Sequence, residues 1–218
     1  MTTWLTRITP DLRHRTAVAD LDNVVALHKT IMRLFPTDLG PNARATAGIL
    51  FRTEQTLGGG VDILLQSTAQ PDEARLAEGY GTIFSRPLDP LLDAVRKGLP
   101  VRYRLIANAT RKLGRNTVVG KPLSVVPLAG ADAEAWWERQ AEQSGLELRE
   151  AVATALTPAV GVRVDKNRGA LQPQRHARTR FDGTAIITDP ELLRERVIAG
   201  IGRAKTYGCG LLTLAPTR

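Results

Sequence analysis

Two successive halves of the chain carry the same predicted order of strands and helices. Period-two alternation and short apolar runs predict strands, and apolar residues at helical spacing behind a capping residue predict helices. In the first half we expect strands at residues 3–9, 47–53, 61–67 and 80–84, a helix carrying residues 24–35, and a helical turn at 71–76. In the second half we expect strands at 101–108, 146–156, 181–188 and 210–214, and helices at 131–144 and 191–199. Each half therefore reads strand-helix-strand-strand-helix-strand.

Local signals mark the helix starts and the boundary between the halves. Asp20 or Asp22 is expected to cap the first helix. Asp189 is expected to cap the last one, because Pro190 follows it at the first helical position. Prolines and a glycine in residues 87–99 indicate a connecting segment.

This repeated order predicts an α+β chain of two tandem ferredoxin-like (RRM-like, βαββαβ) domains. We place the domains at residues 1–90 and 91–218. Enzymes, ribosomal proteins and regulatory modules all use this topology, so the fold alone does not give a function.

The charge balance points to a polyanionic partner. The 218 residues carry a formal net charge of +8, which favours nucleic acid. Arginine outnumbers lysine, and its planar fork suits bidentate contacts with phosphate. Aromatic residues make up only 5% of the chain, so extensive base stacking on exposed rings is not expected.

A dense basic run lies between the second and third strands of the second half. Seven potential cations occur in residues 163–180: Arg163, Lys166, Arg168, Arg175, His176, Arg178 and Arg180. A hairpin or long loop carrying this run would contact successive phosphates of an RNA helix, and the alternative is a solvated surface loop. A second flexible basic loop is expected from Arg111, Lys112, Arg115 and Lys121.

The segment from Gly200 to Pro216 combines glycines with two cations. Gly200, Gly202, Gly208 and Gly210 frame Arg203 and Lys205, between a helix and a strand. Backbone N–H groups in such a turn can bind an anion. The glycines follow a helix, so neither a Walker loop nor a dinucleotide fingerprint fits. A tight helix-to-strand connection explains the segment equally well.

The histidines offer one candidate for acid–base chemistry. Of three histidines, His28 lies in the first predicted helix with Lys29 and Arg33 nearby. A lone histidine in a helix is more often structural than catalytic, so both interpretations stay open. No cluster of metal ligands is visible, and we expect neither a metal nor a cofactor. Cleavage of RNA would then proceed by attack of the 2′-hydroxyl on the adjacent phosphate, leaving a 2′,3′-cyclic phosphate and a 5′-hydroxyl.

Cellular location follows from what the sequence lacks. Cys209 is the single cysteine, which excludes an internal disulfide. No stretch approaches the roughly 20 apolar residues of a membrane-spanning helix, and the N-terminus does not have the form of a signal peptide. We expect a cytoplasmic protein without a membrane partner.

Three separated parts of the sequence carry a family resemblance. The first consists of Trp4-Leu5-Thr6-Arg7, Asp22-Asn23, Leu27-His28-Lys29-Thr30 and Phe35-Pro36. The second consists of residues 103–112, Gly120-Lys121 and the helix at 137–142, and the third of Phe181-Asp182-Gly183, Thr188-Asp189-Pro190 and residues 200–216. Together they span nearly the whole chain, which resembles the precursor-crRNA endoribonucleases of type I-E CRISPR systems, the CasE family.

The resemblance implies a function and roles for particular residues. Members of this family have two ferredoxin-like domains, bind the CRISPR repeat stem-loop, cleave it without metal, and keep the product as a subunit of Cascade. His28 matches the family's catalytic histidine, as general base or general acid. The run from Lys166 to Arg180 would hold the stem, and the glycine-rich segment would hold RNA or pack between the domains. We therefore expect RNA contacts from Lys29, Arg111, Lys112, Arg115, Lys121, Lys166, Arg168, Arg175, Arg178, Arg180, Arg203 and Lys205.

One position departs from the family pattern. Some members carry a tyrosine three residues before the histidine, where this chain has Val25. Either that phenol is dispensable, or Lys29 or a cation of the second domain replaces it. Two other hypotheses remain: a non-catalytic subunit that binds an RNA hairpin, and a small-molecule or phosphate-binding protein. The latter leaves the basic run unexplained.

Overall fold

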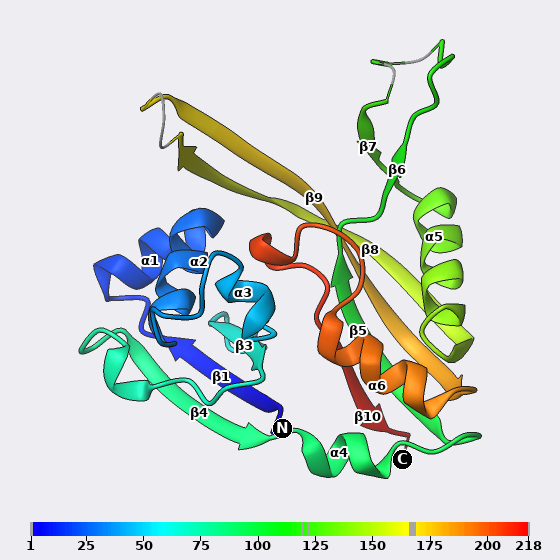
Figure 1. Cartoon of the computed structure of the whole chain (residues 1–218), viewed down its shortest axis with the longest axis horizontal. Coiled ribbons are helices and arrows are strands. Elements are labelled where there is room, and N and C mark those ends of the chain that lie inside the picture. Colours follow the sequence, from blue (N-terminus) through cyan, green and yellow to red (C-terminus); the bar gives the residue numbers. More distant parts are fainter. Residues whose placement is uncertain (1, 119, 122, 166–168, 218) are drawn as a thin grey trace.

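Two four-stranded antiparallel sheets lie side by side in the computed structural model, which describes residues 2–118, 120–121, 123–165 and 169–217 (Figure 1). The first unit contains β1 (Trp4–Pro10), α1 (Arg15–Asp22), α2 (Val24–Arg33), α3 (Ala43–Thr46), β2 (Leu50–Gln55), β3 (Val61–Ser67), the 3-10 turn η1 (Glu73–Arg75) and β4 (Gly81–Pro87).

The second unit follows the short helix α4 (Asp89–Ala94). It contains β5 (Pro100–Ala107), β6 (Thr110–Lys112), β7 (Val125–Pro127), α5 (Ala131–Glu142), β8 (Leu146–Val164), β9 (Leu171–Ile187), α6 (Pro190–Ala199), the 3-10 turn η2 (Lys205–Tyr207) and β10 (Leu212–Pro216).

The strand orders confirm the predicted fold class. They are β2-β3-β1-β4 in the first sheet and β10-β5-β9-β8 in the second. In both sheets the first strand of the unit pairs with the third and fourth, and the second lies at an edge beside the third. This is the strand order of the split βαβ arrangement, so the chain consists of tandem ferredoxin-like units.

Each unit has its own apolar core. In the first unit Leu27 and Ile31 of α2 pack with Phe51 of β2. In the second, the ring of Trp137 from α5 stacks on Phe181 of β9, with 5.7 Å between ring centroids. Burying aromatic rings in this way fixes one helix firmly on its sheet.

A buried arginine connects the two sheets. Arg52 of β2 is 2% exposed, and its Nη1 donates to the carbonyl of Leu211 at 3.0 Å. Its Nη2 donates to Thr213 Oγ1 of β10 at 2.9 Å and pairs with Glu54 at 2.6 Å. A second link runs from Gln66 of β3 to the carbonyl of Val197 in α6, at 2.9 Å. These bonds satisfy polar groups that the interface removes from water, and they fix how the sheets lie against each other.

The start of α2 corrects the predicted cap. Asp20 and Asp22 belong to α1, a separate helix, and Asp20 is buried and accepts from the Tyr80 hydroxyl at 3.0 Å. Asn23 caps α2 instead, since its Oδ1 accepts from the backbone N–H of Val25 at 3.1 Å and of Ala26 at 3.3 Å.

Three other segments are more regular than expected. Residues 87–99, predicted as a connection, contain α4. The second basic cluster, predicted as a flexible loop, begins in the hairpin of β6 and β7. The strands β8 and β9 continue far beyond their predicted ends and pair as far as Val164 and Leu171. Figure 1 shows both hairpins projecting from the same end of the second sheet.

Candidate active site and nucleic-acid interface

The candidate catalytic histidine lies at the margin of the first core. Leu27 and Ile31 bury one face of α2, which places the ring of His28 half-exposed beside them. The ring lies nearly parallel to Phe51, with a centroid distance of 6.3 Å and an interplanar angle of 18°. Its Nδ1 is buried and has no hydrogen-bond partner among the described residues.

This environment keeps the imidazole neutral. Burial, and to a smaller extent the nearby positive charge of Arg44, together lower the pKa of His28 to about 4. At neutral pH the ring therefore has a free nitrogen lone pair and can accept a proton.

The glycine-rich segment folds against the first unit. Its four glycines all have positive φ, from 75° to 93°. A Cβ on Gly208 would lie 3.4 Å from the Phe51 ring, and one on Gly200 would lie 2.6 Å from Leu50. The glycines thus allow η2 and its flanks to approach β2, as a tight connection requires. Because Phe51 touches both His28 and Gly208, the segment lies next to the histidine.

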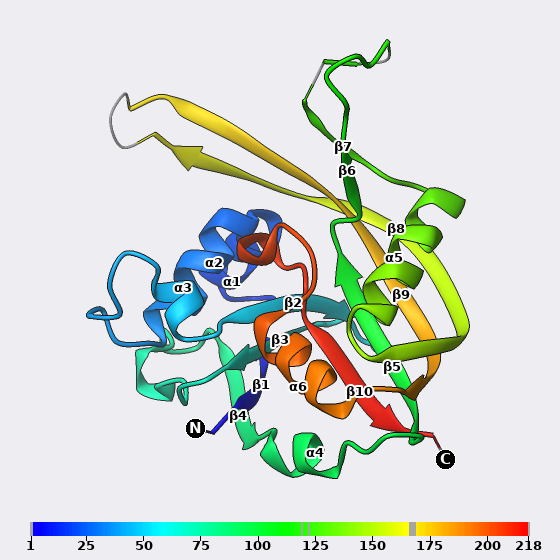
Figure 2. The same cartoon turned by 45° about the vertical axis from the view of Figure 1, so that its right-hand side comes forward.

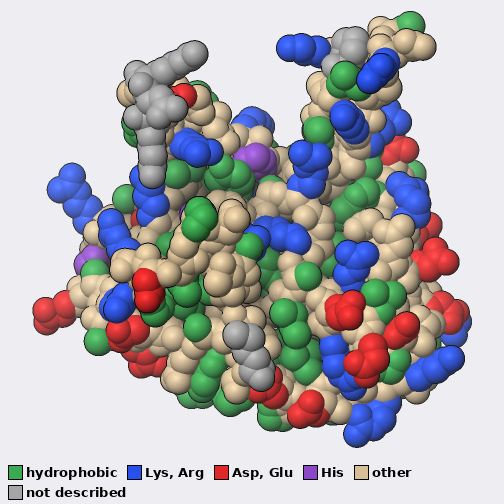
Figure 3. Space-filling model, in the orientation of Figure 1, with side chains coloured by type: hydrophobic (Ala, Val, Ile, Leu, Met, Phe, Trp, Pro, Cys, Tyr) green, Lys and Arg blue, Asp and Glu red, His purple; other side chains and the backbone are tan. Residues whose placement is uncertain are grey.

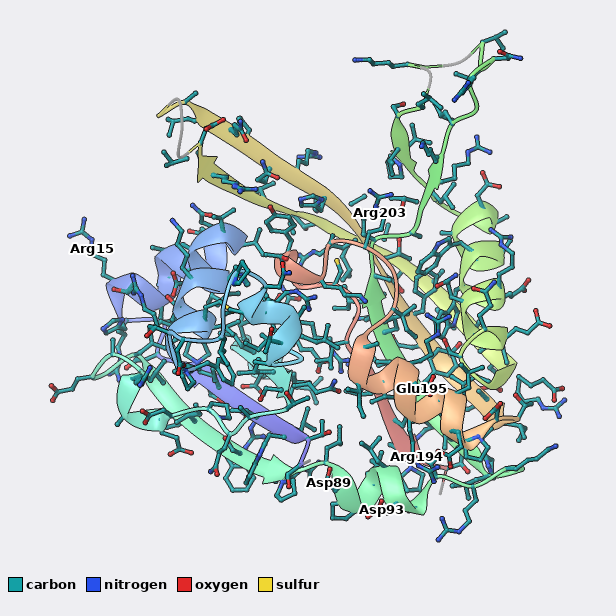
Figure 4. All side chains as sticks on the ribbon, viewed as in Figure 1. Arg15, Asp89, Asp93, Arg194, Glu195 and Arg203 are labelled. Carbon is teal, nitrogen blue, oxygen red and sulfur yellow. The ribbon has the colours of Figure 1, made fainter. Side chains whose placement is uncertain are left out.

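The two cations of this segment lie in different settings. Arg203 is exposed, and its backbone forms an isolated bridge with Asn108. Figure 4 shows its side chain near the crossing of β5 and the β8–β9 hairpin, whereas the labelled Arg15 points away at the far end of α1. Lys205 is partly buried, and its Nζ donates to the carbonyl of Ala199 at 2.8 Å.

The β8–β9 hairpin lies across the N-terminus of α2. A Cβ on Gly161 would come within 2.6 Å of Asn23 Oδ1 and 2.9 Å of Val25 Cγ2, so the strand touches the helix start. On β9, the ring of His176 stacks on Tyr207 of η2 at 4.2 Å and 15°. The hairpin, α2 and the glycine-rich segment therefore meet around the candidate site.

The arginines predicted to hold RNA divide into two groups. Arg175 is exposed. Arg178 is half-buried, and its Nε donates to the carbonyl of Thr157 at 2.9 Å. Arg180 pairs with Asp182 at 2.7 Å. These contacts orient the base of the hairpin. Lys166 and Arg168 lie outside the described residues.

Several exposed cations lie on or beside the two projecting hairpins. Figure 3 shows Lys and Arg side chains along the upper edge, at and between the two projecting hairpins, while most visible Asp and Glu side chains lie along the left, lower and right margins, among further Lys and Arg side chains. The exposed predicted residues are Lys29, Arg111, Lys112, Arg115, Lys121, Arg175 and Arg203. Asp89, Asp93, Arg194 and Glu195 lie at the opposite end, on α4 and α6 (Figure 4).

Sequence reasoning missed Arg44. It lies in the four-residue helix α3, which neither a capping residue nor apolar periodicity predicted. The only cue was a single cation among small residues shortly before an apolar strand, a weak signal without the structure.

Two further observations concern the described part of the chain. It contains no group of three or more His, Cys, Asp or Glu side chains arranged to hold a metal ion. Within it, every helix is too short or too polar to cross a membrane.

Comparisons with known proteins cover nearly the whole chain. Residues 3–216 match the model of the family described as CRISPR associated protein. The CRISPR-associated endoribonuclease Cse3 of Thermus thermophilus is 27% identical over 98% of this chain and 100% of its own length. The Cascade subunit CasE of Escherichia coli K12 is 27% identical over 87% and 90%.

Solved structures agree with these matches. Thermus thermophilus Cse3 bound to an RNA that represents a pre-cleavage complex superposes with a TM-score of 0.80 and 27% identity, covering 99% of this chain and 100% of that one. A chain of a CRISPR RNA-guided surveillance complex, in a pre-nicking state, has 36% identity and a TM-score of 0.68 over 98% and 100%. This protein thus belongs to the CRISPR-associated protein family, among the CasE-like endoribonucleases of type I-E systems.

Proposed function

We propose that this protein binds and cleaves the repeat stem-loop of precursor crRNA, without metal, and keeps the mature crRNA as a subunit of Cascade. The Cse3 relative with bound RNA and the CasE relative named as a Cascade subunit support this proposal. The single buried cysteine supports a cytoplasmic location. The two cores support two domains, which we place at residues 1–90 and 91–218, with Leu88 just before the boundary packing in the second core.

The observation that carries the proposal is a neutral histidine beside a cation and a glycine-rich turn. His28 accepts the proton of the RNA 2′-hydroxyl, whose oxygen attacks the adjacent phosphorus. A bond forms between phosphorus and the 2′-oxygen, and the bond to the 5′-oxygen breaks. The products are a 2′,3′-cyclic phosphate and a 5′-oxygen that takes up a proton.

The exposed cations on and near the two hairpins form the RNA-binding surface. Arg111, Lys112, Arg115, Lys121 and Arg175, on and beside the two hairpins, are exposed and contact the phosphates of the RNA stem. Arg178 and Arg180 act chiefly by orienting the β8–β9 hairpin, given their contacts with Thr157 and Asp182.

The proposal is tested with the full chain, repeat RNA and excess EDTA. We expect the wild type to yield a cyclic phosphate and His28→Ala to lose at least about 100-fold in rate, the usual contribution of a positioned acid–base group. An RNA with 2′-deoxyribose at the scissile position should bind and stay intact. Loss of cleavage in EDTA, or full activity of His28→Ala, contradicts the mechanism.

A second candidate function has one observation in its favour. Val25 is buried against the β8 backbone, so no phenol can reach the site from that position. A non-catalytic hairpin-binding subunit would bind the same RNA tightly and give no cyclic phosphate at any pH. The assay above therefore separates the two functions.

A further inference from the structure

The arrangement around Val25 raises the question of what neutralises the reacting phosphate. Attack by the 2′-oxygen adds negative charge to the phosphorus centre, and such charge needs preorganised donors or cations. Val25 is only 8% exposed, and its backbone and side chain face Gly161 across a contact that leaves no room for a larger group. Val25 has no polar group, so the compensating charge comes from another residue.

Arg44 is one cation that lies near His28. It lies on α3, directly before β2, and its Nη1 donates to the carbonyl of Ile49 at 3.0 Å. That bond holds the guanidinium close enough to His28 for its charge to lower the pKa of the imidazole. No carboxylate pairs with Arg44 among the described residues, and burial lowers the pKa of the guanidinium itself.

Lys205 is a second cation, and it comes from the other unit. The turn η2 that carries it lies beside α2 and α3 in both Figure 1 and Figure 2. Its Nζ is tied to the carbonyl of Ala199. Burial first, and then the charges of Arg44 and Arg196, lower the pKa of Lys205.

Arg44 and Lys205 are both partly buried, their charges repel, and neither forms an ion pair with a carboxylate in the part of the chain that the structure describes, which is costly for the free protein. The charge of Arg44 from α3 acts on His28, and the charges of Arg44 and Arg196 act on Lys205. Lys29 follows His28 on α2, and Lys205 and Tyr207 lie on η2, which is adjacent to α2. None of these residues is a carboxylate. The negative charge of a bound phosphate would offset the repulsion between these cations.

We propose that Arg44 and Lys205 hold the scissile phosphate of the RNA beside His28 and stabilise the charge that develops as the 2′-oxygen attacks. This inference rests on the proposed function and assigns catalytic roles to two further residues. Arg44 offers its unpaired N–H groups to a non-bridging oxygen, and Lys205 approaches from the second unit. His28 acts as general base, because burial and the charge of Arg44 keep the imidazole unprotonated in the free protein.

The alternative is that Arg44 only fastens the α3–β2 turn through Ile49. Arg75 provides a matched control, because its Nη1 also donates to a backbone carbonyl, that of Phe35 at 2.9 Å, while its charge is paired with Asp72. Arg75→Ala therefore removes the same charge and a similar structural bond at a distance from the candidate site.

The test measures single-turnover cleavage of repeat RNA by Arg44→Ala, Lys205→Ala and Arg75→Ala. We expect Arg44→Ala to be about 100-fold slower, as for loss of one preorganised donor, and to bind the RNA almost as well as the wild type because the other phosphate contacts remain. Added guanidinium ion, or Arg44→Lys, should restore part of the rate. Guanidinium should restore none in His28→Ala, and Arg75→Ala should cleave like the wild type.

The histidine pKa gives a readout independent of activity. With only three histidines, NMR titration of the free protein resolves His28. Arg44→Ala should raise the pKa of His28, and Arg75→Ala should leave it unchanged. Wild-type cleavage by Arg44→Ala, or a loss that neither guanidinium nor lysine restores, overturns this inference. In either case an inactive His28→Ala would leave the proposed function intact.

Discussion

At the scale of single residues, the burial of His28 makes stability depend on pH. Its pKa is about 4 in the folded protein and about 6.5 in an unfolded chain. Between these values the unfolded state binds more protons, so the free energy of unfolding falls as pH drops from 6.5 to 4. The full span is worth up to about 3 kcal/mol. In His28→Gln the free energy of unfolding, measured by urea titration at several pH values, should depend less on pH over this range. Parallel curves for both proteins would show that His28 titrates normally.

The same residue shows how far the sequence could predict the site. Family resemblance on Leu27-His28-Lys29 located the histidine without the structure. Its protonation state could not be predicted, because it depends on Arg44 and Phe51, which reach it from later segments. The order of residues within α2 does not show which residues from later segments will pack against it.

At the scale of elements, the crossing of β8 over α2 depends on one glycine. A Cβ on Gly161 would come within 3.0 Å of three atoms of Asn23 and Val25, so Gly161→Ala must displace the hairpin or the cap of α2. We expect a loss of about 1–3 kcal/mol in the free energy of unfolding. Gly58→Ala is the control, because a Cβ there meets nothing within 4 Å. Equal stability of the two variants would show that the crossing adjusts freely.

Strand ends were the least predictable feature of these elements. The sequence indicated a strand only to residue 156, since Pro158 and Gly161 interrupt the apolar pattern. In the structure a register shift between Leu156 and Ala159 absorbs the proline, and pairing resumes beyond it. The central strands β1, β3 and β5 were predicted closely because their alternating residues face a core.

At the scale of the whole molecule, the candidate site forms only if the two units keep their position relative to each other. The candidate site combines α2 and α3 of the first unit with η2 of the second, and Arg52 lies buried between them. Arg52→Ala would leave the buried carbonyl of Leu211 without this donor, and Glu54 would keep only its ion pair with Arg104 at 3.5 Å. Leaving a buried carbonyl without a hydrogen-bond donor costs about 1–3 kcal/mol.

We therefore expect Arg52→Ala to unfold at a lower urea concentration than the wild type and to cleave more slowly, because η2 loses its fixed position beside His28. Arg86→Ala, at an exposed position of β4, should match the wild type in both measurements. If Arg52→Ala costs less than about 1 kcal/mol, apolar contacts such as that of Leu50 with Gly200 hold the units together instead. A loss of stability without a loss of cleavage would mean that η2 keeps its place through its own packing on Phe51.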